Sequence, residues 1–403
     1  AELFEHGFFG ISAAEAAAMD PQQRQLLERG YAALHAASLV RGGLLGATVA
    51  VSVGQWASEF AGVLARTPAA RSVYASTGFS CSVTCGRVSF ALGLQGPCAS
   101  YDTACSASLV AHHTSVRGLQ RRECDAALSA GVNMILDPAT MRGNATAGFT
   151  SVRGRSHTFD VRADGYARGE AIDAVACRLE VGRAVTTAGS AVRQDGRSAS
   201  LTAPNGQAQR GVLVAAWADA RLVAVESAAA LEAHGTGTAL GDPIEAGAVA
   251  AVLCSEASGG CGGQLVAVGS LKANAGHTEP GAGLAGALKL AVQLGGGRMA
   301  PNAQLRALNP HVGGALGGGG SACALPACVG LVLAAEGRLE GGVSSFGYAG
   351  TIAHAVERVS RTDGASRVAS TAVSWRGRHF GWASEGGAPA PPKDRFPAGV
   401  AAI

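Results

Sequence analysis

The stretch from Cys98 to Asn133 constrains the fold most, because two apolar runs flank a segment with helical spacing. The first run ends near Thr103, and the second covers Ala126 to Val132. Between them, apolar or bulky residues recur at i, i+1, i+4 and i+7, namely Leu109, Val110, His113 and Val116. This pattern predicts a strand, a helix and a second strand, with Cys105 at the turn from strand to helix.

Further along the chain, short apolar runs alternate strand and helix character again, over Val223–Ala233, Leu265–Leu271 and Gly281–Leu294. A chain of 403 residues with 48% hydrophobic residues exceeds one ordinary core. We therefore expect two α/β halves, residues 1–205 and 206–360, followed by a linker or tail over 361–403. The glycine-rich run Gly313–Gly320 is expected to be a loop.

Charge and hydropathy exclude several classes of function. The formal net charge is only +3, and basic residues are not interleaved with aromatic ones, which argues against nucleic-acid binding. No apolar run reaches the ~18 residues of a membrane span and no targeting signal is visible, so we expect a cytoplasmic protein. None of the ten cysteines has the C-x2-C spacing of a zinc site, so no metal is expected.

Cys105 is the best candidate nucleophile among these cysteines. Small residues surround it in Tyr101-Asp-Thr-Ala-Cys-Ser-Ala-Ser108, which leaves room for a substrate. A position at the start of a helix favours negative charge, so we expect a lowered thiol pKa and an accessible sulfur. The sequence around Cys105 is equally compatible with a buried structural cysteine.

Three glycine-containing turns carry the other candidate residues. His234 lies in Glu232–Thr238, which reads EAHGTGT and is followed by GDPIE, and His277 lies in Gly269–Pro280, which reads GSLKANAGHTEP. Lys272 stands out because only three of the thirty-two basic residues are lysines. The third turn, Gly341–His354, reads GGVSSFGYAGTIAH and could present backbone N–H donors to an oxyanion.

Taken together, these segments resemble the β-ketoacyl synthases, the ketosynthase domains of polyketide and fatty-acid synthases. The resemblance runs almost from end to end and is closer to modular polyketide synthases than to single-domain bacterial enzymes. Besides the segments above, it rests on FFGISAAEAAAMDPQQRQLLE (Phe8–Glu28), GRVSFALGLQGP (Gly86–Pro97), FDVRADGYARGE (Phe159–Glu170), QDGRSASLTAPNGQAQ (Gln194–Gln209) and LNPHV (Leu308–Val312).

The resemblance implies a thiolase-like fold, in which two similar α/β halves form five layers, αβαβα, and the chain pairs as a homodimer. It implies an acyltransferase that joins a Cys105-bound acyl chain to a malonyl group by decarboxylative condensation. His234 and His277 resemble the two catalytic histidines, Lys272 the lysine that structures the site, and Glu245 a possible partner of that lysine.

The remaining site residues also follow from the resemblance. Thr236 and Thr238 resemble the residues that bind the pantetheine arm, Phe346 and Tyr348 are expected in the substrate-binding loop, and Asn274 beside the site. The Cys105 and Tyr348 N–H groups are expected to form an oxyanion hole. No cofactor is bound directly, because the phosphopantetheine belongs to an acyl carrier protein partner, and acyltransferase or other synthase domains are further partners.

Departures from the family keep two alternatives open. The family's first strand and glycine-rich loop are missing before Phe8, and Tyr348, Ala349 and Ile352 replace the usual Phe, Gly and Asn. Ala349 would be strained if that position requires a positive φ. A transacylase that does not elongate is one alternative, although it often lacks the histidine at position 234. A non-enzymatic dimer partner is the other, although it commonly lacks the cysteine.

Overall fold

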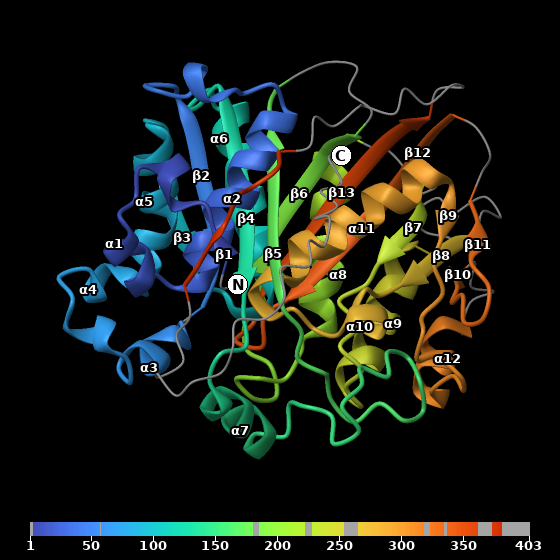
Figure 1. The fold of residues 1–403 in the computed structure, drawn as a ribbon. Helices are drawn as coiled ribbons and strands as arrows, with labels where there is room; N and C mark the ends of the chain where they lie inside the picture. Colours follow the sequence, from blue (N-terminus) through green and yellow to red (C-terminus); the bar gives the residue numbers. More distant parts are fainter. Residues whose placement is uncertain are drawn as a thin grey trace.

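The computed structural model describes residues 3–56, 58–179, 185–221, 228–253, 265–317, 323–333, 337–361 and 373–380, and two β-sheets dominate it (Figure 1). The smaller sheet has the order β3 (Cys98–Tyr101), β2 (Val49–Gly54), β4 (Ala126–Asn133), β5 (Ala171–Cys177). The larger has the order β10 (Cys323–Ala324), β8 (Val266–Gly269), β7 (Ala228–Glu232), β12 (Gly337–Phe346), β13 (Thr351–Arg361), β6 (Val185–Gln194).

Helices form three layers around these sheets (Figure 1). Helices α6 (Ala107–Gln120) and α11 (Ala282–Gly296) lie between the sheets and contact both. The smaller sheet is covered outside by α2 (Pro21–Ala36) and α5 (Cys81–Leu92), and the larger by α8 (Gly206–Asp219), which packs on α9 (Gly241–Leu253). The predicted five-layered αβαβα arrangement of two α/β halves is therefore confirmed.

Shorter elements complete the described part of the chain. The helices are α1 (Ala13–Ala18), α3 (Phe60–Leu64), α4 (Ala75–Gly78), α7 (Pro138–Thr146), α10 (Lys272–Ala275) and α12 (Pro310–Gly317), with 3-10 turns η1 (His6–Phe9), η2 (Arg41–Gly43), η3 (Pro68–Arg71), η4 (Ala104–Ser106) and η7 (Glu279–Gly281). Two small sheets pair β1 (Leu3–Phe4) with β14 (Arg378–His379) and β9 (Arg298–Met299) with β11 (Leu331–Val332). No helix among the described residues is long and apolar enough to cross a membrane.

The two central helices approach each other closely at Gly283 of α11. A Cβ atom there would lie 2.6 Å from the Leu109 Cβ of α6, which no real side chain tolerates. Only glycine therefore permits this helix spacing. Since η4 precedes α6 and η7 precedes α11, the close packing brings these two turns together.

The strand–helix–strand prediction for Cys98–Asn133 is confirmed by β3, α6 and β4. Strand β2 lies between β3 and β4 and runs parallel to both. In the second half, β7, β8 and α11 match the three predicted segments, except that residues 222–227 lie outside the described part of the chain.

The division between the halves differs from the expected 205/206 boundary. Strand β6 pairs with β13 along its length, so Val185–Gln194 belongs to the larger sheet. We therefore propose that the second half begins before Val185.

The structure also bears on the predicted glycine-rich loop and on the predicted C-terminal tail. Of the predicted loop Gly313–Gly320, residues 313–317 are helical within α12, because Val312 and Leu316 are spaced by one helical turn and are buried. Residues 318–320 lie outside the described part of the chain. In the tail, residues 373–380 pack back onto the start of the chain, where the Trp375 ring lies 5.2 Å from that of Phe8.

A buried carboxyl group in β13 gives the stability of the fold a pH dependence. Burial raises the pKa of Glu357 to about 7, against an ordinary value of 4.5, and Thr187 Oγ1 donates a 3.2 Å hydrogen bond to it. Between these pH values the folded chain keeps the proton that the unfolded chain has lost, so stability falls as pH rises from about 4.5 to 7. We expect Glu357→Gln to raise the free energy of unfolding by about 3 kcal/mol at pH 8 and by little at pH 4.

Urea unfolding of both proteins at the two pH values measures this difference. An equal effect of the substitution at pH 4 and pH 8 would contradict the assignment.

Candidate active site

Cys105 lies in η4, the single turn between β3 and α6. The residue before it, Ala104, has a left-handed backbone with φ +53°, which is uncommon for a residue other than glycine. Neighbouring side chains hold the turn: Ser106 Oγ donates to the Thr103 carbonyl at 2.9 Å, and Ser345 Oγ donates to the Cys105 carbonyl at 2.7 Å. Because Ser345 belongs to β12, both halves of the chain fix the position of the thiol.

The sulfur is buried rather than accessible, and this corrects the expectation of a lowered pKa. Burial raises the pKa of the Cys105 thiol to about 12, while the charge of Lys272 and hydrogen bonds from the Cys105 and Tyr348 N–H groups act in the opposite direction. The two backbone groups expected to form an oxyanion hole are therefore close enough to the sulfur to lower the pKa of the thiol. The effect of burial is larger, so the resting residue is a neutral thiol.

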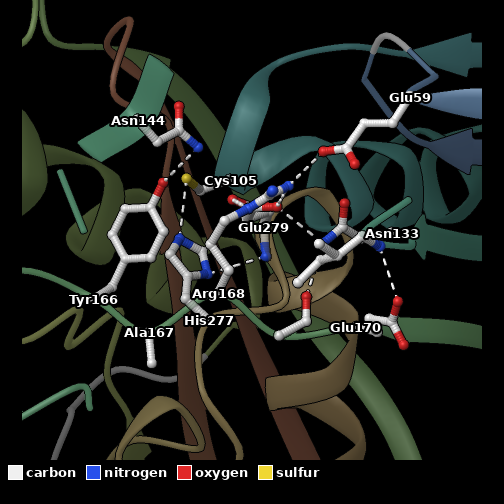
Figure 2. A network of polar contacts seen from close by, with 12 residues as sticks. Glu59, Cys105, Asn133, Asn144, Tyr166, Ala167, Arg168, Glu170, His277 and Glu279 are labelled. Carbon is white, nitrogen blue, oxygen red and sulfur yellow. Dashed lines mark hydrogen bonds and ion pairs between the residues drawn. The ribbon is translucent and has the colours of Figure 1, made fainter. Parts of the chain in front are cut away.

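His277 contacts the thiol directly. Its Nε2 lies 3.1 Å from Cys105 Sγ, and its Nδ1 accepts a 3.1 Å hydrogen bond from the Glu279 N–H (Figure 2). Burial lowers the pKa of His277 well below its usual value, so the ring is neutral. Since a backbone N–H can only donate, Nδ1 carries no proton and the ring hydrogen is on Nε2, facing the sulfur.

His234 shows the same arrangement on a different turn. Its Nδ1 accepts a 3.2 Å hydrogen bond from the Phe346 N–H, which again leaves the ring hydrogen on Nε2. The ring centroids of His234 and His277 are 5.8 Å apart, and burial lowers the pKa of His234 well below its usual value. Two neutral imidazoles therefore lie edge to face, and one of them, His277, contacts Cys105.

Lys272 and Glu245 lie near this pair of histidines and act on it through charge and through backbone hydrogen bonds. Burial lowers the pKa of Lys272, and the carboxylates of Glu232 and Glu245 act against that shift. Glu245 accepts backbone hydrogen bonds from His234 at 2.7 Å and Gly235 at 2.8 Å. Its direct partner is therefore the backbone of the histidine turn, and it reaches Lys272 through its charge.

The predicted substrate-binding residues lie around the two histidines. Thr236 and Thr238 have hydroxyl oxygens 3.3 Å apart in the turn after β7. Phe346 is buried, with its ring centroid 5.3 Å from that of His234. Tyr348 is 49% exposed and its ring lies 5.7 Å from that of Phe149, at the outer end of the site.

Asn274 is separate from this group. Its exposed amide donates a 3.0 Å hydrogen bond to the Pro301 carbonyl, so it fastens α10 to a neighbouring loop. The expected strain at Ala349 is also absent: the positive φ of this loop, +91°, is at Gly350. Ile352 is fully buried in the core of the second half, at the position where the family pattern predicts an asparagine.

A polar network behind His277 was not predicted from the sequence (Figure 2). Arg168 forms ion pairs with Glu279 at 2.7 Å and with Glu59 at 2.8 Å. Tyr166 places its ring 4.8 Å from the His277 ring, edge to face, and its hydroxyl accepts a 3.4 Å hydrogen bond from Asn144. The sequence shows the charged stretch Phe159–Glu170 and a glutamate two positions after His277. Neither feature indicates which residue Arg168 or Glu279 would pair with.

The described residues contain no group of three or more His, Cys, Asp and Glu side chains that could hold a metal ion. The site therefore consists of a thiol, two imidazoles, an ammonium group and backbone N–H donors.

Comparison with known proteins identifies the family to which this site belongs. The model of the N-terminal domain of β-ketoacyl synthases matches residues 1–177, and that of the C-terminal domain matches residues 184–306. The chain belongs to the β-ketoacyl synthase family. The family consists of acyl-transferring, condensing enzymes, and the fold described above is their thiolase-like fold.

The relatives of this ketosynthase are polyketide synthases. A phenolphthiocerol/phthiocerol polyketide synthase of Mycobacterium tuberculosis is 41% identical over 360 residues, 88% of this chain and 23% of that protein. A highly reducing polyketide synthase of Cordyceps militaris is 39% identical over 386 residues, 93% of this chain and 14% of that protein. The ketosynthase thus spans less than a quarter of the length of these relatives.

A solved structure agrees with this assignment. The ketosynthase from module 6 of the bacillaene synthase of Bacillus subtilis matches with a TM-score of 0.80 and 30% identity, covering 90% of this chain and 62% of that chain. The chain is therefore a ketosynthase domain of the polyketide synthase type.

Proposed function

We propose that this ketosynthase elongates an acyl chain by decarboxylative condensation, with Cys105 as the nucleophile. The observation that carries the proposal is that His234 and His277 are adjacent, are both neutral and both carry their ring hydrogen on Nε2, with His277 Nε2 in contact with the thiol. Two fixed N–H donors suit an oxygen on which negative charge develops, as in the enolate of a thioester.

In the first step the Cys105 sulfur attacks an acyl thioester presented by an acyl carrier protein. The bond between Sγ and the acyl carbon forms, the bond from that carbon to the pantetheine sulfur breaks, and the thiol proton leaves with the pantetheine. We propose that the Cys105 and Tyr348 N–H groups, which lower the pKa of the thiol at rest, stabilise the oxyanion of this step. Each such donor is worth about 3 kcal/mol.

In the second step a malonyl thioester loses CO2. The electron pair of the broken carbon–carbon bond stays on the remaining thioester, which becomes an enolate. Nε2–H of His234 and of His277 donate to the enolate oxygen, so no metal is needed. The enolate carbon attacks the acyl carbon on Cys105, a carbon–carbon bond forms and the bond from that carbon to Sγ breaks. Cys105 leaves as a thiolate, which takes one proton from solvent. The charge of Lys272 lowers the pKa of Cys105 and therefore stabilises this thiolate.

The phosphopantetheine arm is part of the substrate and reaches the site on the carrier protein. Thr236 and Thr238 fit this arm chemically, because their hydroxyl groups, 3.3 Å apart beside His234, can donate to and accept from its amides. We propose that acyltransferase or other synthase domains work with this domain, as its polyketide synthase relatives suggest.

Product formation tests the proposal. We expect the purified protein, given an acyl carrier thioester and a malonyl carrier thioester, to release CO2 and yield a β-ketoacyl thioester that is detected by mass spectrometry. Exchange of the acyl group between carriers without a new carbon–carbon bond would instead identify a transacylase.

We also propose a homodimer that pairs along β3. This strand lies at the edge of the smaller sheet, where its backbone can pair with another strand, and the neighbouring α5 carries Phe90, 89% exposed. We expect Phe90→Asp to shift the protein from dimer to monomer in sedimentation experiments, whereas Val214→Asp, on the exposed face of α8, leaves the dimer intact. A wild-type protein that sediments as a monomer would contradict this proposal.

A further inference from the structure

The backbone of Glu279 is strained at the position where it contacts the catalytic histidine. Glu279 has φ +50°, in the left-handed region that residues with a side chain rarely adopt. It begins η7, two residues after His277, and its N–H donates to His277 Nδ1 at 3.1 Å. A right-handed backbone at Glu279 would turn its N–H relative to its side chain, and the two could no longer keep their present contacts together.

The Glu279 side chain is held from two directions (Figure 2). Arg168 binds it in a bidentate manner, with Nε donating to Oε1 at 2.7 Å and Nη2 donating to Oε2 at 2.8 Å. Asn133 Nδ2, at the end of β4, donates to Oε2 at 2.9 Å. Paired, planar contacts of this kind fix the orientation of a carboxylate as well as its position.

Arg168 is itself fixed and almost fully buried. Its side chain is 1% exposed, and Nη2 also donates to Glu59 Oε1 at 2.8 Å. The residues on either side of it hold the His277 backbone: the His277 N–H donates to the Ala167 carbonyl at 2.7 Å, and the Gly169 N–H donates to the His277 carbonyl at 2.8 Å. One short segment, Ala167–Gly169, therefore holds both the histidine and the residue that contacts its ring.

We propose that Arg168 is a positioning residue that, by holding Glu279 in its strained backbone conformation, keeps the ring hydrogen of His277 on Nε2, facing Cys105. The proposal deepens the function proposed above and rests on it for its kinetic consequence. Without the guanidinium, Glu279 loses its bidentate partner and its backbone can relax. The Glu279 N–H then leaves Nδ1, and the ring hydrogen is free to move there. A lone pair on Nε2 would then face the enolate oxygen in place of a donor.

Arg168→Met tests the proposal, because methionine keeps much of the apolar length of the side chain but has no donors. Arg168→Lys restores a cation that can make only one of the two contacts. Arg87→Met is the matched control: Arg87 in α5 is also buried and also pairs with a carboxylate, Glu15, and its Nε donates to Gln23 at 2.9 Å. It lies outside the polar network of Figure 2.

The first readout is the tautomer of His277, observed by nitrogen-15 NMR of histidine-labelled protein and assigned by comparison with His277→Gln. We expect a single Nε2–H form in the wild type and in Arg87→Met, a mixture of the two tautomers in Arg168→Met, and a partial return in Arg168→Lys. An unchanged tautomer in folded Arg168→Met would overturn the proposal.

The second readout compares the two half-reactions. We expect Arg168→Met to slow decarboxylation of the malonyl thioester by roughly tenfold or more, and acyl loading on Cys105 by less than about twofold, because the loading step depends on backbone donors. An equal fall of both rates, as in a merely structural defect, would also overturn it. If Arg168→Met does not fold, Glu279→Gln carries the same comparison, with a smaller effect expected in the same direction.

The experiments also distinguish an error in the proposed condensation from an error in the role of Arg168. A wild-type protein that decarboxylates no malonyl thioester would refute the condensation chemistry, whereas the NMR comparison would still decide whether Arg168 sets the His277 tautomer.

Discussion

Cys105→Ala is expected to abolish acyl loading and to lower condensation by roughly four orders of magnitude or more, because Cys105 is the thiol that contacts the His277 imidazole. The Cys105 sulfur lies 3.1 Å from His277 Nε2, and the backbone N–H groups of Cys105 and Tyr348 lower the pKa of the thiol. Intact-protein mass spectrometry after incubation with an acyl thioester measures the loading directly.

Cys124→Ala is the control for this substitution. Cys124 is also a buried thiol, but it packs in a small apolar cluster with Leu119 and Ala127. We expect the Cys124→Ala protein to be acylated on Cys105 to the same extent as the wild type. Acylation of Cys105→Ala at the wild-type level would mean that another residue is the nucleophile.

His277→Ala is expected to separate the two half-reactions. Removing one donor to a developing oxyanion costs about 10²–10³ in rate, so decarboxylation and condensation should fall by this factor. Acyl loading should persist, because the donors proposed for that step are the backbone N–H groups of Cys105 and Tyr348, which the substitution leaves in place. Single-turnover measurements of acyl-enzyme formation and of CO2 release separate the two steps.

His113→Ala provides the comparison, since His113 is a partly buried histidine whose Nδ1 lies 2.9 Å from Ser190 Oγ, on α6 but outside the histidine pair. It should condense at nearly the wild-type rate. Condensation by His277→Ala at the normal rate would refute the role of the imidazole.

The fold and the central residues could be predicted because their signals are local. The apolar runs around Cys105 indicate the strand, turn and helix, and the turns containing His234 and His277 follow strands β7 and β8 of one sheet. Parallel neighbouring strands bring such turns to the same edge of a sheet. The resemblance to ketosynthases then suggests roles for Cys105, His234 and His277, of which the structure brings His277 into contact with each of the other two.

Other features depend on tertiary packing, which no local pattern contains. The turn at Cys105 predicts a lowered thiol pKa, but both halves of the chain bury the sulfur and the effect of burial is the larger. Likewise, the expected boundary places β6 in the first half, whereas β6 pairs with β13 of the larger sheet. The residues of a strand do not determine which other strand it pairs with. The glycine-rich residues 313–317 resemble a loop, yet burial of Val312 and Leu316 stabilises a helix there.

The network behind His277 escapes sequence-based prediction for a related reason. Arg168 and Glu279 are 111 positions apart in sequence, and each is an ordinary charged residue in its own segment. Their significance comes from a left-handed backbone at Glu279 and from a hydrogen bond to one ring nitrogen. Only the three-dimensional structure relates these observations to the catalytic histidine.

The central claim is that Cys105 carries an acyl chain which a malonyl group then removes by condensation. Peptide mass spectrometry of the Cys105 peptide, before and after addition of malonyl carrier protein, tests it most directly. The account predicts an acyl thioester on Cys105 that disappears upon this addition as a β-ketoacyl product forms. An adduct that survives the addition would indicate a transacylase, and the absence of any adduct would indicate a non-enzymatic partner; either result would contradict the account.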